Sequence, residues 1–180
     1  MYFFRVKRTI RKKGINTVIF MKRILNSLSH YFFKILGIRF FGRPSLYIET
    51  SGKCNLACQF CAYSIKEIPQ KVITVEQFIS QVNQTLDLGI KDFGLTPTTG
   101  EIFLDQTIEE KLIYLNQNQR VASYHFFSNL TAIPLKRLEK VFDIINDGKM
   151  TEFGVSIYGY NEDEFNRMTL RPNNLFKKSL

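Results

Sequence analysis

Residues 54–61 read Cys-Asn-Leu-Ala-Cys-Gln-Phe-Cys, and this stretch holds all three cysteines of the 180-residue chain. Three residues separate the first two cysteines, and two separate the second from the third. A tight loop with this spacing can direct three thiolates at one point. Thiolates are the preferred ligands of soft metal centres and of iron–sulfur clusters. The stretch therefore predicts a metal centre.

The absence of a fourth cysteine limits which metal centres the loop can hold without another ligand. A cubane iron–sulfur cluster has four irons, and electron-transfer clusters bind each of them with a cysteine. Three cysteines would leave one iron open to an outside ligand. A structural zinc ion also needs a fourth protein ligand, and a zinc site stays an alternative because His30 or His125 could supply it. The odd number of cysteines argues against a disulfide framework.

The Cys-x3-Cys-x2-Cys pattern, with Asn55 after the first cysteine and Phe60 before the last, resembles the radical S-adenosylmethionine (radical SAM) superfamily. The resemblance implies a 4Fe-4S cluster on Cys54, Cys58 and Cys61, with S-adenosyl-L-methionine on the open iron. In that family an electron from the reduced cluster cleaves the sulfonium, and the resulting 5′-deoxyadenosyl radical abstracts hydrogen from a substrate. The resemblance also implies an electron donor of flavodoxin or ferredoxin type. Phe60 would pack the loop against the cluster or cofactor, and no residue is assigned as catalytic.

Composition places the chain among globular proteins. Its apolar fraction is 44% and its charged fraction 23%. The sequence contains no run of eighteen apolar residues that would predict a membrane-spanning helix, and it does not open with a signal-peptide pattern. Three clustered cysteines that must stay reduced favour a cytoplasmic location.

Residues 1–43 are expected to form a basic extension to a core domain at residues 44–180. The extension carries eleven of the 25 Lys and Arg residues and none of the 16 Asp and Glu residues. Apolar residues at helical spacing predict an amphipathic helix within it: Met21, Leu25, Leu28, Phe32 and Ile35. This helix could dock on the core domain, or it could lie on an anionic membrane surface and hold the protein at the membrane periphery. Nucleic-acid binding is not favoured, because the basic arm has no matching motif.

From residue 44 onward, expected strands alternate with expected helices. The strands are predicted at residues 46–50, 92–97, 121–127 and 152–157. The helices are predicted at residues 74–88, 105–118, 134–146 and 162–168, with a further one after Asn174. Thr74 and Gln77 form a capping-box pattern. The alternation predicts an α/β fold of parallel βα repeats, and the resemblance makes it a partial, TIM-like radical SAM barrel of about four units.

Ligands of parallel barrels bind at the carboxyl ends of the strands. After the second expected strand, residues 98–101 read Thr-Thr-Gly-Glu and resemble the family's Gly-Gly-Glu stretch, which holds the amino group of S-adenosylmethionine. Gly100 would allow a close backbone approach, and Glu101 would accept hydrogen bonds from the ammonium. Thr99 replaces the first glycine of the family pattern. Like Gly100 and Glu101, it is expected to contact the cofactor.

Polar residues also follow the third and fourth expected strands. Ser128 and Asn129 match the family's polar pair near the adenosine, and Ser156 matches a serine that meets the cofactor's carboxylate or ribose. These residue types also begin ordinary loops, so a purely local role stays open. His125 lies among aromatic residues and is expected to be a core or rim histidine with no site role.

The family's core has six βα units, whereas this chain has room for about four units of roughly thirty residues each. Two functional readings follow. The chain is a radical SAM enzyme, completed by a partner chain or a homodimer, or it is a truncated, catalytically inactive remnant that binds at most a cluster. A zinc-binding interaction module is the third reading. An open four-strand sheet is expected to expose its last edge, and the substrate is not predicted.

Overall fold

The computed structural model describes residues 2–6, 44–61, 69–96 and 99–170. The chain divides into two units, one made of Met1–Lys7 with Ser45–Leu180 and the other of Arg8–Pro44. The sheet and the cysteine loop belong to the first unit. The predicted amphipathic helix of the extension and the helix predicted after Asn174 lie outside the described residues.

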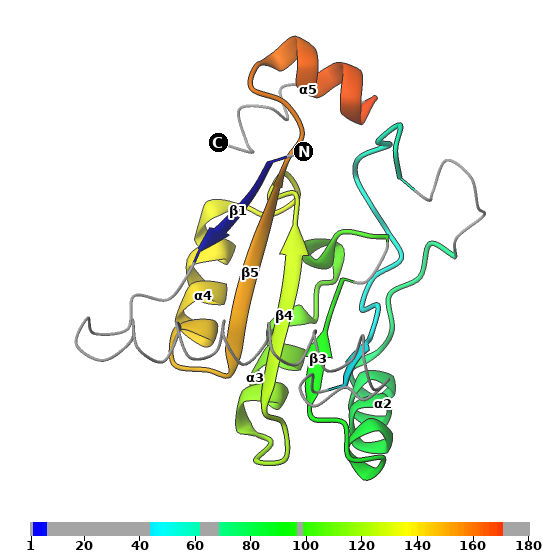
Figure 1. The fold of residues 1–180 in the computed structure, drawn as a ribbon, viewed down its shortest axis with the longest axis vertical. Helices are drawn as coiled ribbons and strands as arrows, with labels where there is room; N and C mark the ends of the chain where they lie inside the picture. The colour runs from blue at the N-terminus through cyan, green and yellow to red at the C-terminus, as the bar shows by residue number, and fades with distance from the viewer. Residues whose placement is uncertain (1, 7–43, 62–68, 97–98, 171–180) are drawn as a thin grey trace, which may run out of the picture. The chain divides into compact units, whose positions relative to one another are not determined.

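The described part of the first unit is built on one five-stranded sheet with strand order β1-β5-β4-β3-β2. Four strands are mutually parallel: β2 (Ser45–Tyr47), β3 (Asp92–Gly94), β4 (Ser123–Ser128) and β5 (Met150–Ile157). The helices α3 (Ile108–Gln117) and α4 (Leu135–Asn146) lie behind the sheet in Figure 1, and α2 (Val75–Asp87) is drawn beside β3 at the lower right. The short helix α5 (Glu162–Thr169) lies beyond the carboxyl end of β5. The predicted alternation of parallel strands and helices is confirmed.

Local sequence signals explain where the helices begin and end. At the start of α2, the Thr74 side chain accepts from the backbone of Gln77, and the Gln77 side chain accepts from the backbone of Thr74, which confirms the capping box. Gly89 follows this helix with a φ of +82°, a left-handed conformation that suits glycine. The helix predicted from residue 105 begins later, at Ile108, because Ile102–Leu104 form the 3-10 helix η2 and Asp105 bonds to Thr107 between the two.

The main hydrophobic core lies between the sheet and the helices behind it. Along β4, buried side chains alternate with partly exposed ones, as expected for a strand whose two faces differ. Tyr124 and Phe126 are fully buried in this core, together with Phe93 of β3 and Phe153 of β5. The helices contribute Phe78, Val82, Ile108, Leu112 and Val141 to the same cluster.

The edge of β5 is paired, contrary to the expectation of an exposed last edge. The strand β1 (Tyr2–Val6) runs antiparallel to β5, from the pair Tyr2↔Ile157 to the pair Val6↔Phe153. Its sequence, Tyr-Phe-Phe-Arg-Val, is rich in residues that favour strands. Pairing supplies partners for backbone groups that an open edge would leave free. The first residues of the predicted extension therefore belong to the sheet.

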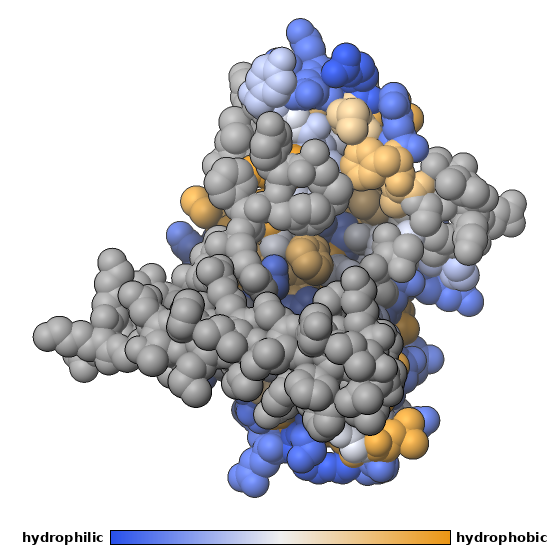
Figure 2. Space-filling view, in the orientation of Figure 1, coloured by the Kyte–Doolittle hydropathy of each residue, from blue (hydrophilic) through white to orange (hydrophobic). Residues whose placement is uncertain are grey.

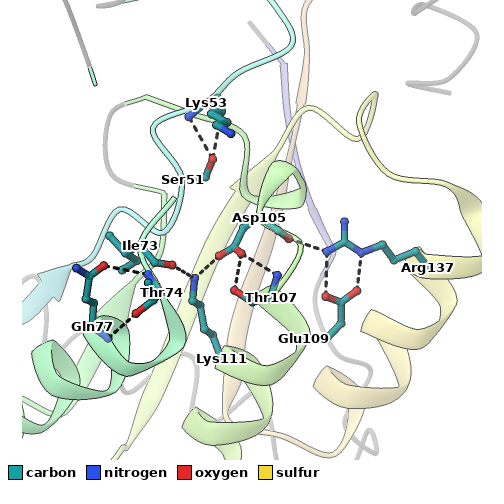
Figure 3. A network of polar contacts seen from close by, with 10 residues as sticks. All are labelled: Ser51, Lys53, Ile73, Thr74, Gln77, Asp105, Thr107, Glu109, Lys111 and Arg137. Atoms are coloured by element: carbon teal, nitrogen blue, oxygen red, sulfur yellow. Dashed lines mark hydrogen bonds and ion pairs between the residues drawn. The ribbon is translucent and has the colours of Figure 1, made fainter. Parts of the chain in front are cut away.

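A buried polar network holds the helix layer together (Figure 3). Lys111 forms a fully buried ion pair with Asp105, and its ammonium also donates to the backbone oxygen of Ile73. Arg137 of α4 donates to the backbone oxygens of Phe103 and Asp105. It also pairs with Glu109. The network joins the segment before α2 to η2, α3 and α4.

Among the residues that the structure describes, no helix has the length and apolar character needed to cross a membrane.

Candidate metal centre and cofactor site

The four parallel strands present polar or cysteine-bearing segments at their carboxyl ends. The three cysteines follow β2, and Thr99 to Glu101 follow β3. Ser128 is the last residue of β4 and Asn129 comes directly after it, and Ser156 lies near the end of β5. Because the strands are parallel, these segments lie at the same end of the sheet.

The cysteine loop packs in a small apolar cluster of its own. Cys58 is 7% exposed and lies in a cluster with Leu56 and Phe165 of α5. Cys54 and Cys61 are partly buried and pack against this cluster. The backbone N–H of Cys61 donates to the oxygen of Cys58 over 3.0 Å and closes a turn between them. The apolar lining limits the access of water to the three thiols.

The thiols influence one another electrostatically. Burial raises the pKa of Cys54 to about 11, and the charges of Glu101 and Cys61 add to the increase. Burial likewise raises the pKa of Cys58 to about 12, with further contributions from Cys54 and Cys61. Three thiolates so close together are unfavourable without a cation. A bound iron centre supplies that positive charge, so the thiols would lose their protons as the metal binds.

Among the described residues, no three His, Cys, Asp or Glu side chains are grouped so that they could hold one metal ion. A zinc ion at the cysteine loop and an iron–sulfur cluster, in which each cysteine binds a different iron, both stay predictions from the sequence.

Glu101 is a buried acceptor next to this loop. Its side chain is almost fully buried, with 2% of the residue exposed. The hydroxyl of Ser128 donates to Oε1 over 2.6 Å and the backbone N–H of Asn129 donates to Oε2 over 2.8 Å. The backbone N–H of Phe103 donates to Oε1 over 3.3 Å. Burial raises the pKa of Glu101, while these three donors act to lower it.

The carboxylate of Glu101 has room for one more donor. A carboxylate offers about four acceptor positions, and three are used here. Within the described ranges, no Lys or Arg forms an ion pair with Glu101. Buried charges are normally paired. An N–H group of a ligand would fill the remaining acceptor position.

Gly100 brings the backbone of this segment against the chain between β2 and the cysteine loop. Its φ is +87°, and a Cβ at this position would lie 1.8 Å from the backbone oxygen of Ser51. The backbone N–H of Glu101 donates to the oxygen of Lys53 over 2.7 Å. Only glycine fits this contact with Ser51, and the predicted approach of Gly100 to the cofactor stays a prediction. The neighbouring Thr99 is buried, and its hydroxyl donates to Glu49.

Asn129 connects the cysteine loop to Glu101. Its side-chain amide lies 4.0 Å from Sγ of Cys54 and donates to Oδ1 of Asn55 over 3.2 Å. Its backbone N–H is one of the three donors to Glu101. Its side-chain oxygen accepts from the backbone N–H and hydroxyl of Thr131. One residue therefore holds the first cysteine and the buried carboxylate in a fixed relation.

Tyr158 is a site residue that the sequence reasoning missed. Its ring packs against the cysteine cluster and lies 5.4 Å, centroid to centroid, from the ring of Phe60. Its hydroxyl is hydrogen-bonded to the side chain of Ser156. Burial raises the pKa of Tyr158, and the charges of Cys58, Cys54 and Glu101 raise it further. Tyr158 comes directly after β5, and a period of two continued past the strand end puts it on the same side as Ser156, which is the signal that could have identified it.

Phe60 lies at the surface of the site. Phe60 is 48% exposed. Apolar atoms are visible at the surface beside the end of α5 at the upper right of Figure 2. The packing of Phe60 against the cluster or cofactor remains a prediction. So do the adenosine contacts of Ser128 and Asn129, and the contact of Ser156 with the cofactor's carboxylate or ribose.

His125 lies away from the thiols, on β4. Its ring packs edge-on against Tyr47 and Phe127, with centroids 5.6 and 6.1 Å apart. Burial lowers the pKa of His125, and the charge of Glu152 only partly opposes this. These contacts agree with the expected role of a half-buried rim histidine.

Comparison with known proteins identifies the class. A model of the radical SAM superfamily matches residues 48–180. The chain belongs to the radical SAM superfamily, whose members typically bind a 4Fe-4S cluster and S-adenosylmethionine. A search of curated proteins finds no match.

Two solved structures of BtrN share the fold. One is described as BtrN in complex with AdoMet and 2-DOIA, with a TM-score of 0.51 and 13% identity over 74% of this chain. The other is selenomethionine BtrN in an open conformation, with a TM-score of 0.53 and 15% identity over 70% of this chain. The matches cover 54% and 55% of the BtrN chains, so this chain spans about half their length. At this identity the likeness shows the fold, a partial radical SAM barrel with four parallel strands.

Proposed function

We propose that this protein is a radical SAM enzyme that binds a 4Fe-4S cluster through Cys54, Cys58 and Cys61 and binds S-adenosylmethionine at the open iron. The observation that carries the proposal is the link through Asn129, which holds a buried carboxylate, Glu101, next to the first cysteine. An iron-ligating thiol and a hydrogen-bond acceptor for the iron-bound amino group are the two protein groups that this cofactor pair requires.

The residues present fit both groups. The chain has three cysteines, which would leave the fourth iron for the amino and carboxylate groups of S-adenosylmethionine. Glu101 has one free acceptor position and no cationic partner among the described residues, so it would accept from the amino group. Ser128 and Asn129 orient that carboxylate, and Gly100 keeps its backbone against the cysteine loop.

When bound, the reduced cluster supplies the electron that cleaves the sulfonium of S-adenosylmethionine to give a 5′-deoxyadenosyl radical. The chain's own residues would bind the cluster, orient S-adenosylmethionine and shield both from water. Leu56 and Phe165 surround Cys58 with apolar groups that exclude water. Tyr158 packs against the cysteine cluster and against the ring of Phe60, where the two rings would limit access of solvent to the radical.

The cluster needs an electron donor, and we propose one of flavodoxin or ferredoxin type. The substrate is left open, because the 2-DOIA of the BtrN complex is a ligand of BtrN and is not carried over to a chain of 13% identity. A completing chain or a homodimer remains a proposal. Such a partner would have to displace β1 if it were to extend the sheet at β5, because that edge is paired.

Anaerobic reconstitution with iron and sulfide tests the proposal, followed by electron paramagnetic resonance of the reduced protein with and without S-adenosylmethionine. The expected result is a cluster signal that changes when S-adenosylmethionine is added. Glu101→Gln keeps the size of the side chain and is expected to weaken the response without loss of the cluster. A cluster signal that does not change on addition of S-adenosylmethionine would favour the alternative hypothesis, in which the protein binds a cluster but is catalytically inactive. Zinc without a cluster would contradict the proposal altogether.

A further inference from the structure

The cysteine loop is hydrogen-bonded to the last turn of α5. The backbone N–H of Ala57 donates to the oxygen of Thr169 over 3.0 Å, and that of Gln59 donates to the oxygen of Met168 over 3.1 Å. The side-chain amide of Gln59 donates to the oxygen of Arg167 over 2.9 Å. These three carbonyls belong to the end of a helix, where the last four oxygens have no partner within the helix.

Side-chain packing joins the same two segments. Phe165 of α5 is fully buried and packs with Leu56 and Cys58 of the loop. Thr169 is also fully buried, and its hydroxyl donates to the oxygen of Phe165. Leu170 ends the helix in the left-handed conformation, with a φ of 53°. The end of α5 is therefore a fixed structure against which the loop rests (Figure 1).

These hydrogen bonds hold the chain on both sides of the middle cysteine, Cys58. Ala57 and Gln59 are the two neighbours of Cys58 in the sequence, so its backbone is held on both sides by α5. Two of the three bonds come from the backbone and persist in most variants. The third comes from the side chain of Gln59, which can be changed without touching a cysteine.

We propose that the carboxyl end of α5 positions Cys58 for the cluster and that Gln59 is the positioning residue of this contact. The inference rests on the cluster binding proposed above. It implies that cluster loading and the docking of α5 are thermodynamically coupled. If docked α5 favours the loaded loop, the loaded loop must favour docked α5 by the same factor.

Two variants of Gln59 and one control variant of Gln84 test the positioning role, and both glutamines are exposed. Gln59→Glu removes the donor and places a carboxylate at the negative end of the helix dipole. Gln59→Lys restores a donor and adds a charge that this helix end favours. Gln84→Glu is the matched control, because Gln84 is exposed on α2 and its amide donates to Ser80 in the same helix. Loss of one such bond corresponds to a change of about two- to tenfold.

The experiment uses the full chain, reconstituted anaerobically, and measures the rate of iron loss to a chelator together with hydrogen exchange of the α5 amides. Gln59→Glu is expected to lose iron up to about tenfold faster, while Gln59→Lys and Gln84→Glu match the wild type. Cluster loading is expected to protect the α5 amides in the wild type and less so in Gln59→Glu. A purely structural role would change the exchange of apo α5 without altering the rate of iron loss.

The outcomes separate this inference from the proposed function. If the wild type takes up a cluster and Gln59→Glu releases iron at the wild-type rate, the positioning role is wrong. Loading that leaves α5 exchange unchanged in the wild type would also overturn the coupling. A wild type that takes up no cluster overturns the proposed function itself, and this inference with it.

Discussion

The side-chain amide nitrogen of Asn129 lies 4.0 Å from Sγ of Cys54, although 75 positions separate the two residues. The same residue donates its backbone N–H to Glu101. The fold thus brings a thiol from the first parallel strand's loop, an acceptor from the second and a polar link from the third to one place. Each of these groups can be altered separately, so the contribution of each is measurable.

Asn129→Ala is expected to loosen the relation between the cysteine loop and Glu101. The variant loses the side-chain bonds to Asn55 and Thr131 but keeps the backbone donor to Glu101. We expect the free energy of unfolding to fall by about 1–3 kcal/mol, because buried polar partners are left unpaired. Urea unfolding of the apo protein measures this effect. An unchanged unfolding midpoint would show that the link contributes nothing to the fold.

Gly100→Ala is expected to be strongly destabilising. The new Cβ would meet the backbone oxygen of Ser51 at 1.8 Å, and the φ of +87° is unfavourable for alanine. We expect a loss above about 3 kcal/mol, because the backbone must move as well as adopt a strained conformation. Gly89→Ala is the matched control, since Gly89 has a φ of +82° but nothing within 4 Å of its added Cβ. The control should lose only about 1 kcal/mol. Equal losses in urea unfolding would contradict the steric account.

Lys111→Met is expected to cost about 3–5 kcal/mol, because it leaves the carboxylate of Asp105 buried without its cation. The exposed pair of Arg120 and Asp87 provides the comparison, with side chains that are 49% and 68% exposed. Arg120→Met should cost less than about 1 kcal/mol. Denaturant unfolding of both variants checks the difference. A loss for Lys111→Met as small as that for Arg120→Met would mean that the buried pair is not essential to the helix layer.

Tyr158→Phe is expected to separate packing from hydrogen bonding at the cofactor site. The variant keeps the ring against the cysteine loop and Phe60 but loses the bond to Ser156. We expect normal iron and sulfide content and a dissociation constant for S-adenosylmethionine that rises by about two- to tenfold. Tyr158→Ala should also reduce the cluster content. Isothermal titration of the reconstituted protein measures the affinity, and wild-type affinity in Tyr158→Phe would assign the hydroxyl no part in binding.

Sequence patterns predicted the repeating part of the fold well. The helical spacing of apolar residues and the capping box at Thr74 and Gln77 predicted α2 and its first turn. The alternation of strands and helices indicated the parallel sheet. The pairing of β1 with β5 was not predictable, because the sequence of a short strand does not indicate which distant strand it will pair with. The late start of α3 depends on the 3-10 turn at Ile102–Leu104 and on the bond from Thr107 to Asp105.

The candidate site was predictable where side-chain identity carries the chemistry. The cysteine spacing and the Gly100-Glu101 pair stand out in the sequence, and the structure places them next to each other. Contacts made by backbone carbonyls have no such signature. The hydrogen bonds from Ala57 and Gln59 to α5 therefore emerged only from the structure.

The central claim is that an iron left free by the three cysteines binds the amino group of S-adenosylmethionine beside Glu101. Electron–nuclear double resonance on the reduced, reconstituted protein with S-adenosylmethionine labelled with ¹⁵N at the amino group tests it most directly. The account predicts a ¹⁵N coupling to the cluster in the wild type, weakened or lost in Glu101→Gln while the cluster remains. A cluster with no ¹⁵N coupling in the wild type, at saturating S-adenosylmethionine, would contradict it.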